Sequence, residues 1–260
     1  MISNILRDKP TRLFVIFAAF FVANALIAEC IGTKIFSLEK LFGAEPFHFS
    51  LLGESGLALS LTCGVLLWPL EFVMTDIINE YYGPKAVRRI SYIAVFLISY
   101  AFLMFYMAMS VPPADFWYGT GVQDGVPDMS KAFNSIFGQG MWIIIGSLTA
   151  FLVSQVVDVT VFHQIKKRTG DRKMWLRATG STLVSQMVDS FIVLYIAFHI
   201  GKDWSFQKVL AIGMVNYAYK FTVAILLTPL IYLIHRFIES YLGKETAEKM
   251  KYAAMNPDSE

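Results

Sequence analysis

Six apolar stretches, each long enough to cross a lipid bilayer as a helix, dominate this sequence of 260 residues. A helix needs about 20 largely apolar residues to span the hydrocarbon core. The stretches cover approximately residues 13–31, 56–77, 90–111, 141–162, 178–199 and 209–234. They predict an all-α polytopic membrane protein, with a bundle of six transmembrane helices in residues 1–238 and a charged tail in residues 239–260.

The composition excludes several classes of soluble protein. Hydrophobic residues make up 56% of the chain and charged residues 16%, whereas soluble domains carry about 25% charged residues. The formal net charge of +2 gives no basic excess that would indicate nucleic-acid binding. Cys30 and Cys63 are too few for a disulfide framework or a four-ligand zinc site. We expect both to be free buried thiols, and a single disulfide between neighbouring helices is the alternative.

The distribution of Lys and Arg predicts the orientation in the membrane. Sixteen of the 22 basic residues lie in the N-terminus, the second and fourth loops and the tail, against five in the other loops. Cytoplasmic segments carry this excess, so both termini are predicted on the cytoplasmic side of the cytoplasmic membrane. Residues 23–25 resemble a signal-peptide cleavage site. Because apolar character continues beyond Ala25, we interpret the first stretch as an uncleaved span.

Charged and amide side chains interrupt the apolar stretches. An ionisable group at the centre of a membrane helix costs at least about 2.5 kcal/mol and usually faces the protein interior. A short repeat supplies four of these side chains, because Ser-Gln-Val-Val-Asp at 154–158 is followed by Ser-Gln-Met-Val-Asp at 185–189. In an antiparallel helix pair, the spacing predicts a polar ring in which Gln155 lies level with Asp189, and Asp158 with Gln186.

Lys220 lies deep in the last apolar stretch, one helical turn from Asn216. A buried Lys requires a neutralising carboxylate, and Asp189 or Asp158 is the expected partner. One interpretation is an ion pair that locks helices together, and the other is a binding site for a planar polar solute. The predicted substrate-binding residues are Glu71, Gln155, Asp158, Gln186, Asp189, Asn216 and Lys220.

A second polar motif occupies residues 68–84, where Asp76, Asn79 and Glu80 precede Gly83-Pro84. The Gly-Pro pair predicts the end of a helix. One interpretation makes the motif a gate or a substrate contact. The alternative is a cytoplasmic cap, in which the two acids pair with Lys85, Arg88 and Arg89.

Enzyme motifs are missing from the sequence. It contains no Gly-rich phosphate loop, no His-Glu-x-x-His and no serine nucleophile elbow, and its four histidines are scattered. We therefore predict a protein that is not an enzyme, uses no cofactor and holds no metal.

The stretch from Pro69 through Thr75-Asp76, Glu80-Tyr81-Tyr82-Gly83 and Ala86-Val87-Arg88 resembles the signature of the queuosine precursor transporter family. That resemblance implies uptake of 7-deazaguanine bases, such as 7-cyano- and 7-aminomethyl-7-deazaguanine, by a carrier in the lipid bilayer. A carboxylate could accept hydrogen bonds from the ring N–H and the exocyclic amine of a guanine-like base, and Asp189 or Asp158 is expected to do so.

Two other classes of membrane protein are alternatives to this interpretation. One is the substrate-binding subunit of an energy-coupling-factor vitamin transporter, which would dock through small-residue pairs such as Ala19/Ala23 or Ala28/Gly32. The other is a membrane scaffold or an intramembrane enzyme, against which the many polar residues and the missing catalytic groups argue. The energy source, the preferred base and a homo-oligomeric state are left open by the sequence.

Overall fold

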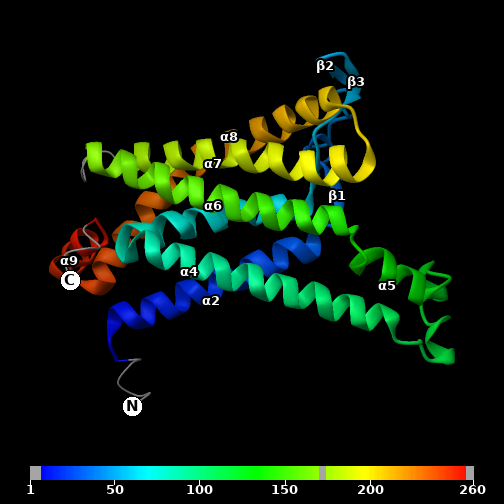
Figure 1. Ribbon diagram of the computed structural model, residues 1–260, viewed down its shortest axis with the longest axis horizontal. Helices are drawn as coiled ribbons and strands as arrows, with labels where there is room; N and C mark the ends of the chain where they lie inside the picture. The colour runs from blue at the N-terminus through cyan, green and yellow to red at the C-terminus, as the bar shows by residue number, and fades with distance from the viewer. Residues whose placement is uncertain (1–6, 170–173, 256–260) are drawn as a thin grey trace.

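A computed structural model describes residues 7–169 and 174–255 and shows long helices packed lengthwise (Figure 1). The long helices are α2 (Lys9–Ile31), α4 (Trp68–Ser110), α6 (Met141–Thr169), α7 (Met174–Leu194) and α8 (Phe206–Leu242). The shorter elements are β1 (Ile35–Ser37), α3 (Leu38–Leu41), β2 (Phe49–Leu51), β3 (Glu54–Leu57), β4 (Ser60–Thr62), η1 (Cys63–Leu66), η2 (Asp115–Trp117), η3 (Val122–Asp124), α5 (Met129–Phe137), η5 (Tyr195–Ile200) and α9 (Lys244–Met255). Arg172 and Lys173 of the basic loop, and residues 256–260 of the predicted tail, lie outside the described residues.

Five helical segments of the described residues are long and apolar enough to cross a membrane. They are Lys9–Ile31, Trp68–Ser110, Met129–Thr169, Trp175–Ile200 and Phe206–Leu242. The first continues through Ala25 to Ile31, and the Asp8 carboxylate caps its N-terminus by accepting a hydrogen bond from the Thr11 amide at 2.9 Å. The chain is therefore a polytopic, predominantly helical membrane protein.

The helical segments number five rather than six because α4 is one continuous helix by its hydrogen bonds, although its axis changes direction at Gly83. Gly83 inside it has φ 79° and ψ 173°, which are not helical, and Pro84 follows. Met74 and Ile98 belong to one hydrophobic cluster, although a straight helix would separate them by about 36 Å. The arms on either side of Gly83 therefore fold back on each other, and they contain the third predicted stretch and the part of the second from Trp68 onward.

The second stretch begins as strand rather than helix, which corrects the prediction of a helix from Gly56. Residues 54–57 and 60–62 form β3 and β4, and helix α4 begins only at Trp68. Gly56 has φ 73°, a conformation that ends regular helix. β1 pairs antiparallel with β4, and β2 with β3. The all-α prediction is thus wrong for these two small sheets, which cover one end of the bundle (Figure 1).

The C-terminal segment packs against the bundle instead of leaving it. Ala247 and Ala254 of α9 are buried, and Lys251 binds Glu239 at 2.5 Å. The backbone of Ala254 lies so close to Gly83 that a Cβ atom there would come within 3.3 Å of the Ala254 carbonyl oxygen. Helix α9 therefore supports the reversal of α4.

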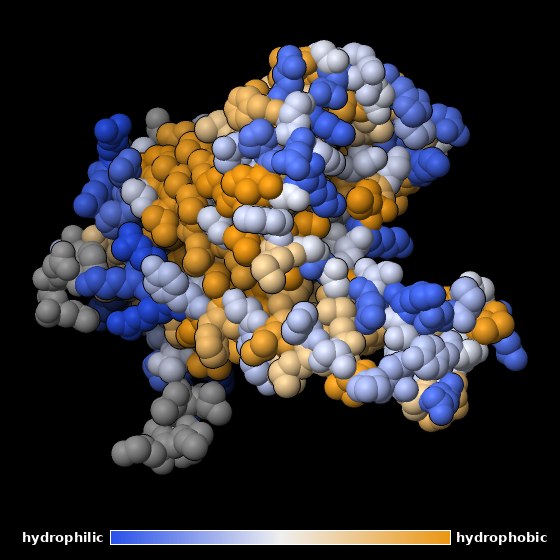
Figure 2. Space-filling model, turned by 45° about the vertical axis from the view of Figure 1, so that its right-hand side comes forward, coloured by the Kyte–Doolittle hydropathy of each residue, from blue (hydrophilic) through white to orange (hydrophobic). Residues whose placement is uncertain are grey.

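The molecular surface carries a broad apolar area between hydrophilic ends (Figure 2). Large hydrophobic side chains are exposed along the helices, among them Phe96, Tyr106, Leu226, Leu233 and Phe237. Such a surface, on helices long enough to span a membrane, indicates contact with lipid. In the described chain, Cys30 and Cys63 are both free thiols, as the main interpretation predicted, but they are partly rather than fully buried.

Candidate functional site

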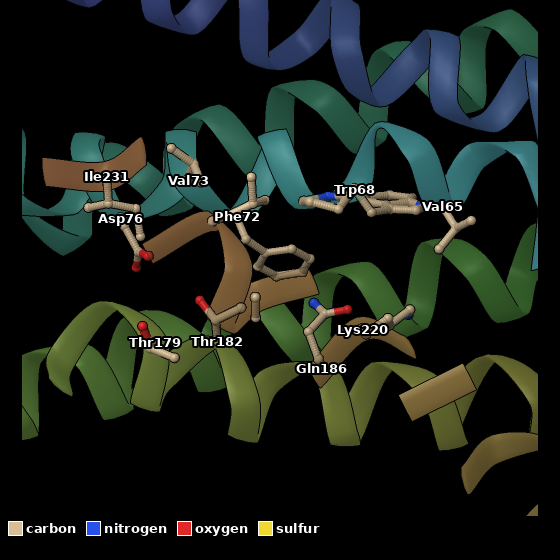
Figure 3. A pocket seen from close by; sticks show the side chains of 13 residues that line it. Val65, Trp68, Phe72, Val73, Asp76, Thr179, Thr182, Gln186, Lys220 and Ile231 are labelled. Atoms are coloured by element: carbon tan, nitrogen blue, oxygen red, sulfur yellow. The ribbon is translucent and has the colours of Figure 1, made fainter. Parts of the chain in front are cut away.

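A cavity of about 440 Å³ lies between the first arm of α4, helix α7 and helix α8 (Figure 3). That volume includes the open mouth of the cavity. Small-molecule sites are mostly apolar with a few polar groups, and the lining of this cavity has that composition. Aromatic and aliphatic side chains from η1, α4 and α8 form most of the wall. The lining residues are Val65, Trp68, Pro69, Phe72, Val73, Asp76, Thr179, Thr182, Gln186, Lys220, Ala224, Leu227 and Ile231.

Asp76 supplies the acidic group of the cavity. Its side chain is 2% exposed, and neither carboxylate oxygen makes a hydrogen bond of normal geometry to any described residue, although Thr182 lies near enough to interact with it. Figure 3 shows Asp76 and Thr182 on opposite walls, facing each other. A carboxylate in this position has two acceptors to offer to a ligand.

Gln186 supplies an amide from the opposite wall. Its Nε2 atom is buried and has no hydrogen-bond partner among the residues that the structure describes. Figure 3 shows the amide directed from α7 toward Trp68 and Phe72. Buried polar groups nearly always have a hydrogen-bond partner in folded proteins, so the Gln186 amide is available to donate to a ligand or to water.

Lys220 forms an ion pair with Asp189, as the sequence predicted. The two side chains are only 14% and 21% exposed, so each needs the other. Lys220 lines the cavity beside Gln186, and the pair connects α8 to α7. Asn216 is half-buried one turn earlier on α8 and does not line this cavity.

The predicted polar ring of α6 and α7 does not form. Gln155 exchanges hydrogen bonds with Thr75 of α4 at 3.2 Å, and Asp158 accepts one from Ser185 at 3.0 Å. The prediction treated the two helices as an isolated pair. In the structure the first arm of α4 covers the polar face of α6, so Gln155 binds Thr75 of that arm, whereas Asp158 binds Ser185 of α7 and Gln186 turns toward the cavity.

Glu80 is held by cations from two other helices. It pairs with Lys166 of α6 at 3.0 Å and with Arg177 of α7 at 2.8 Å, and all three side chains are no more than 2% exposed. The suggestion that Glu80 pairs with the basic residues after Gly83 is therefore corrected. Counting basic residues assigned Lys166 and Arg177 to a cytoplasmic loop, whereas packing against α4 buries them.

Glu71 and Asn79 lie on the first arm of α4 but do not line the cavity. Glu71 is fully buried and accepts a hydrogen bond from the Asn24 amide at 3.0 Å. Its Oε1 atom and the Nδ2 atom of Asn79 are without hydrogen-bond partners in the described part of the chain. Both residues therefore belong to the polar interior around the cavity rather than to its wall.

Three cavity residues were not singled out from the sequence. Trp68 and Phe72 offer aromatic rings, and Thr182 offers a hydroxyl across from them (Figure 3). The spacing of Trp68, Phe72 and Asp76 by four residues could have revealed one helix face. Thr182 lies four residues before Gln186 on α7 and could have been found in the same way.

Membrane-spanning helices that enclose polar side chains around a cavity are typical of membrane transporters. The comparisons with known proteins agree with this class. Residues 62–234 match the protein-family model described as "Putative vitamin uptake transporter".

Three bacterial proteins are similar over most of their length. A "Probable queuosine precursor transporter" of Bacillus subtilis is 32% identical over 224 residues, which cover 84% of each chain. The "Queuosine precursor transporter" of Escherichia coli is 27% identical over 201 residues, 72% of this chain and 82% of the relative. A "Probable queuosine precursor transporter" of Haemophilus influenzae is 24% identical over 234 residues, 86% of this chain and 87% of the relative.

The chain belongs to the queuosine precursor transporter family, a family of transporters and not of enzymes. No solved structure matches it. The predicted family is thus confirmed.

Proposed function

We propose that this protein imports 7-deazaguanine bases, including 7-cyano- and 7-aminomethyl-7-deazaguanine, across the cytoplasmic membrane as a secondary carrier. The names of the three relatives support the substrate class. The cavity supports it independently, because the unpaired acceptors and donor in its wall match the edge of a guanine-like base.

We propose six membrane crossings, with both termini in the cytoplasm. The two arms of α4 each provide one crossing, and α2, α6, α7 and α8 provide the other four. The excess of Lys and Arg on one side of the predicted topology supports this orientation.

The observation that carries the substrate proposal is the placement of unpaired polar atoms on one cavity. The Asp76 carboxylate accepts hydrogen bonds from the ring N–H and the exocyclic amine of the base, and the Gln186 amide donates to its carbonyl. Trp68 and Phe72 provide apolar ring surfaces against which a planar base packs.

The other predicted residues act around this contact. Lys220 borders the cavity with its charge neutralised by Asp189. Thr75 fixes Gln155, Ser185 binds Asp158, and Glu71 is bound by Asn24. We assign to Asp76 the contact with the donor edge that the sequence suggested for Asp189 or Asp158, because Asp76 alone of the three lines the cavity.

The test is uptake of labelled 7-cyano-7-deazaguanine by cells that cannot make it and that lack energy-coupling ATPases. We expect accumulation that depends on this protein. Replacement of Gln186→Leu keeps the side-chain size and should lower uptake about tenfold or more, since an unmet buried carbonyl costs about 1–3 kcal/mol. Met187→Leu, at a neighbouring position that is 44% exposed, is the matched control and should transport normally.

Two results would contradict the proposal. Without accumulation despite normal membrane insertion, the substrate class would be wrong. Accumulation only in cells that contain the ATPases would instead indicate a binding subunit of an energy-coupling-factor transporter. The structure already uses one of the small-residue pairs suggested for such docking, because Gly64 packs on Ala28 and Gly32.

A further inference from the structure

Five charged side chains are buried together where α4, α6 and α7 meet. They are Asp76, Glu80, Asp158, Lys166 and Arg177, and each is no more than 2% exposed. Three carboxylates thus face two cations, and both cations pair with Glu80. The cluster carries one negative charge more than its cations neutralise.

Asp76 and Asp158 are the carboxylates that lack an ion-pair partner in the described chain. Two contacts join α4 to α6 on either side of Asp76 and Asp158: Thr75 binds Gln155 at 3.2 Å, and Glu80 binds Lys166 at 3.0 Å. The charges of Asp76 and Asp158 are near enough to repel each other. Both oxygens of Asp76 and Oδ2 of Asp158 make no hydrogen bond of normal geometry to the described residues, although the Thr182 hydroxyl lies near Asp76 and the Ser181 hydroxyl near Asp158.

Arg177, besides pairing with Glu80, is near enough to Asp76 to favour its charged form. Other charged and titratable groups lie on the elements packed around the cluster. On neighbouring elements these are Glu29 of α2, Glu71 and Tyr81 of α4, Asp189 of α7, and Lys220 and His235 of α8. Lys220 is neutralised by Asp189, and His235 contacts the Tyr81 hydroxyl at 3.0 Å. Three buried carboxylates that share two cations do not all remain ionised together. The pair of Asp76 and Asp158 therefore holds a proton.

We propose that Asp158 is the proton site of this carrier and that a proton enters the cell together with each substrate molecule. This inference rests on the proposed function. With the proton on Asp158, the pair keeps one negative charge, on Asp76, where it accepts the donors of the base. The Ser185 hydroxyl donates to Oδ1 of Asp158, which leaves the unpaired Oδ2 atom to carry the proton.

Release inside the cell completes the coupling. When the cavity opens to the cytoplasm, water reaches the carboxylates and the proton leaves with the base. Water that enters the opened site then hydrates both charges, which removes the requirement for a proton while the site is open. The substrate is neutral in the 7-cyano form, so the proton gradient drives its accumulation.

The test uses the purified full chain in proteoliposomes with labelled 7-cyano-7-deazaguanine. Exchange of labelled for unlabelled base, with no gradient, measures the proposed function. Accumulation under an inward proton gradient of one pH unit measures the coupling, and one proton per molecule sustains about a tenfold concentration ratio. A pH-sensitive dye inside the vesicles should report acidification on substrate entry.

Asp158→Asn mimics the protonated side chain and keeps an oxygen to accept from Ser185. We expect this variant to exchange substrate at a rate near that of the wild type but to lose the tenfold accumulation. Glu29→Gln is the matched control, because Glu29 is also a buried carboxyl that accepts a hydrogen bond from a serine, Ser147, and it does not line the cavity. It should retain gradient-driven accumulation.

Unimpaired accumulation by Asp158→Asn would overturn the assignment of the proton site. Wild-type accumulation driven by sodium, or substrate entry without internal acidification, would overturn proton coupling itself, and the dye measurement decides this even if the variant fails to insert. Loss of exchange in the wild type would instead refute the proposed substrate.

Discussion

Lys220 of α8 forms an ion pair with Asp189 of α7, one helical turn beyond Gln186 at the border of the cavity. Helices from the last third of the chain are thereby joined beside the proposed substrate. The pair can serve as a helix lock, as a substrate contact, or as both, and the two roles respond differently to mutation.

Asp189→Asn should lower the initial uptake rate at least tenfold, equivalent to about 1.4 kcal/mol, while the protein remains inserted. The substitution keeps the side-chain shape but leaves the Lys220 charge uncompensated beside the cavity. Uptake and membrane abundance should be measured together. The double variant Asp189→Leu with Lys220→Leu separates the roles, because an apolar pair can replace a simple lock. Normal uptake by this double variant would show that the pair only joins helices.

Glu80→Gln should destabilise the protein by about 3–5 kcal/mol, because it leaves two buried cations without their carboxylate. The measurement is thermal unfolding in detergent, compared with wild type. Glu245→Gln is the control, since the Glu245–Lys249 pair has side chains 83% and 75% exposed, and exposed pairs contribute about 0–1 kcal/mol. Equal melting temperatures for the two variants would contradict a structural role of the buried triad.

Gly83→Ala should destabilise the reversal of α4 by about 1–3 kcal/mol, because a side chain strains the backbone at φ 79° and ψ 173°. The added Cβ would also come within 3.3 Å of the Ala254 carbonyl oxygen. Thermal unfolding should show the loss, and protease sensitivity of α9 should rise. Gly140→Ala is matched, because a Cβ atom there meets nothing within 4 Å. If Gly83→Ala behaved like this control, the strained reversal would not need glycine.

The loop between α2 and α4 should loosen in acid. The hydrogen bond from the Leu59 amide holds the pKa of Glu39 below its ordinary value of 4.5, and that contact is 2.6 Å long. A lowered carboxyl pKa contributes stability above 4.5 and loses it as the pH falls through the lower folded value.

Hydrogen exchange of the Leu59 amide, corrected for its intrinsic pH dependence, is the measurement for this loop. Protection should fall in that acidic range in the wild type. Glu39→Gln should abolish this pH dependence because its side chain does not titrate. A wild-type response identical to that of the variant would contradict the role of the carboxylate.

The apolar length of the stretches was sufficient to predict membrane helices, although the second begins as strand, and the buried charge of Lys220 was sufficient to narrow its partner to Asp189 or Asp158. The prediction failed where a third helix intervenes. The repeat placed Gln155 and Asp158 opposite α7, and Asp158 does bind Ser185 of α7, but Thr75 of α4 takes the amide of Gln155. Likewise, Lys166 and Arg177 have loop-like positions in sequence, and only the contact with Glu80 explains their burial.

The sequence by itself determined the class of protein, because hydrocarbon thickness sets the length of a spanning helix and the cost of buried charge restricts polar residues to the interior. It also determined the family through one contiguous motif around Asp76 and Gly83. Only the tertiary structure decided which polar groups share the cavity, since helix rotation and the reversal at Gly83 bring Asp76, Gln186 and Lys220 together from three helices. Spacing along one helix fixes which residues share a face, but packing decides what that face meets.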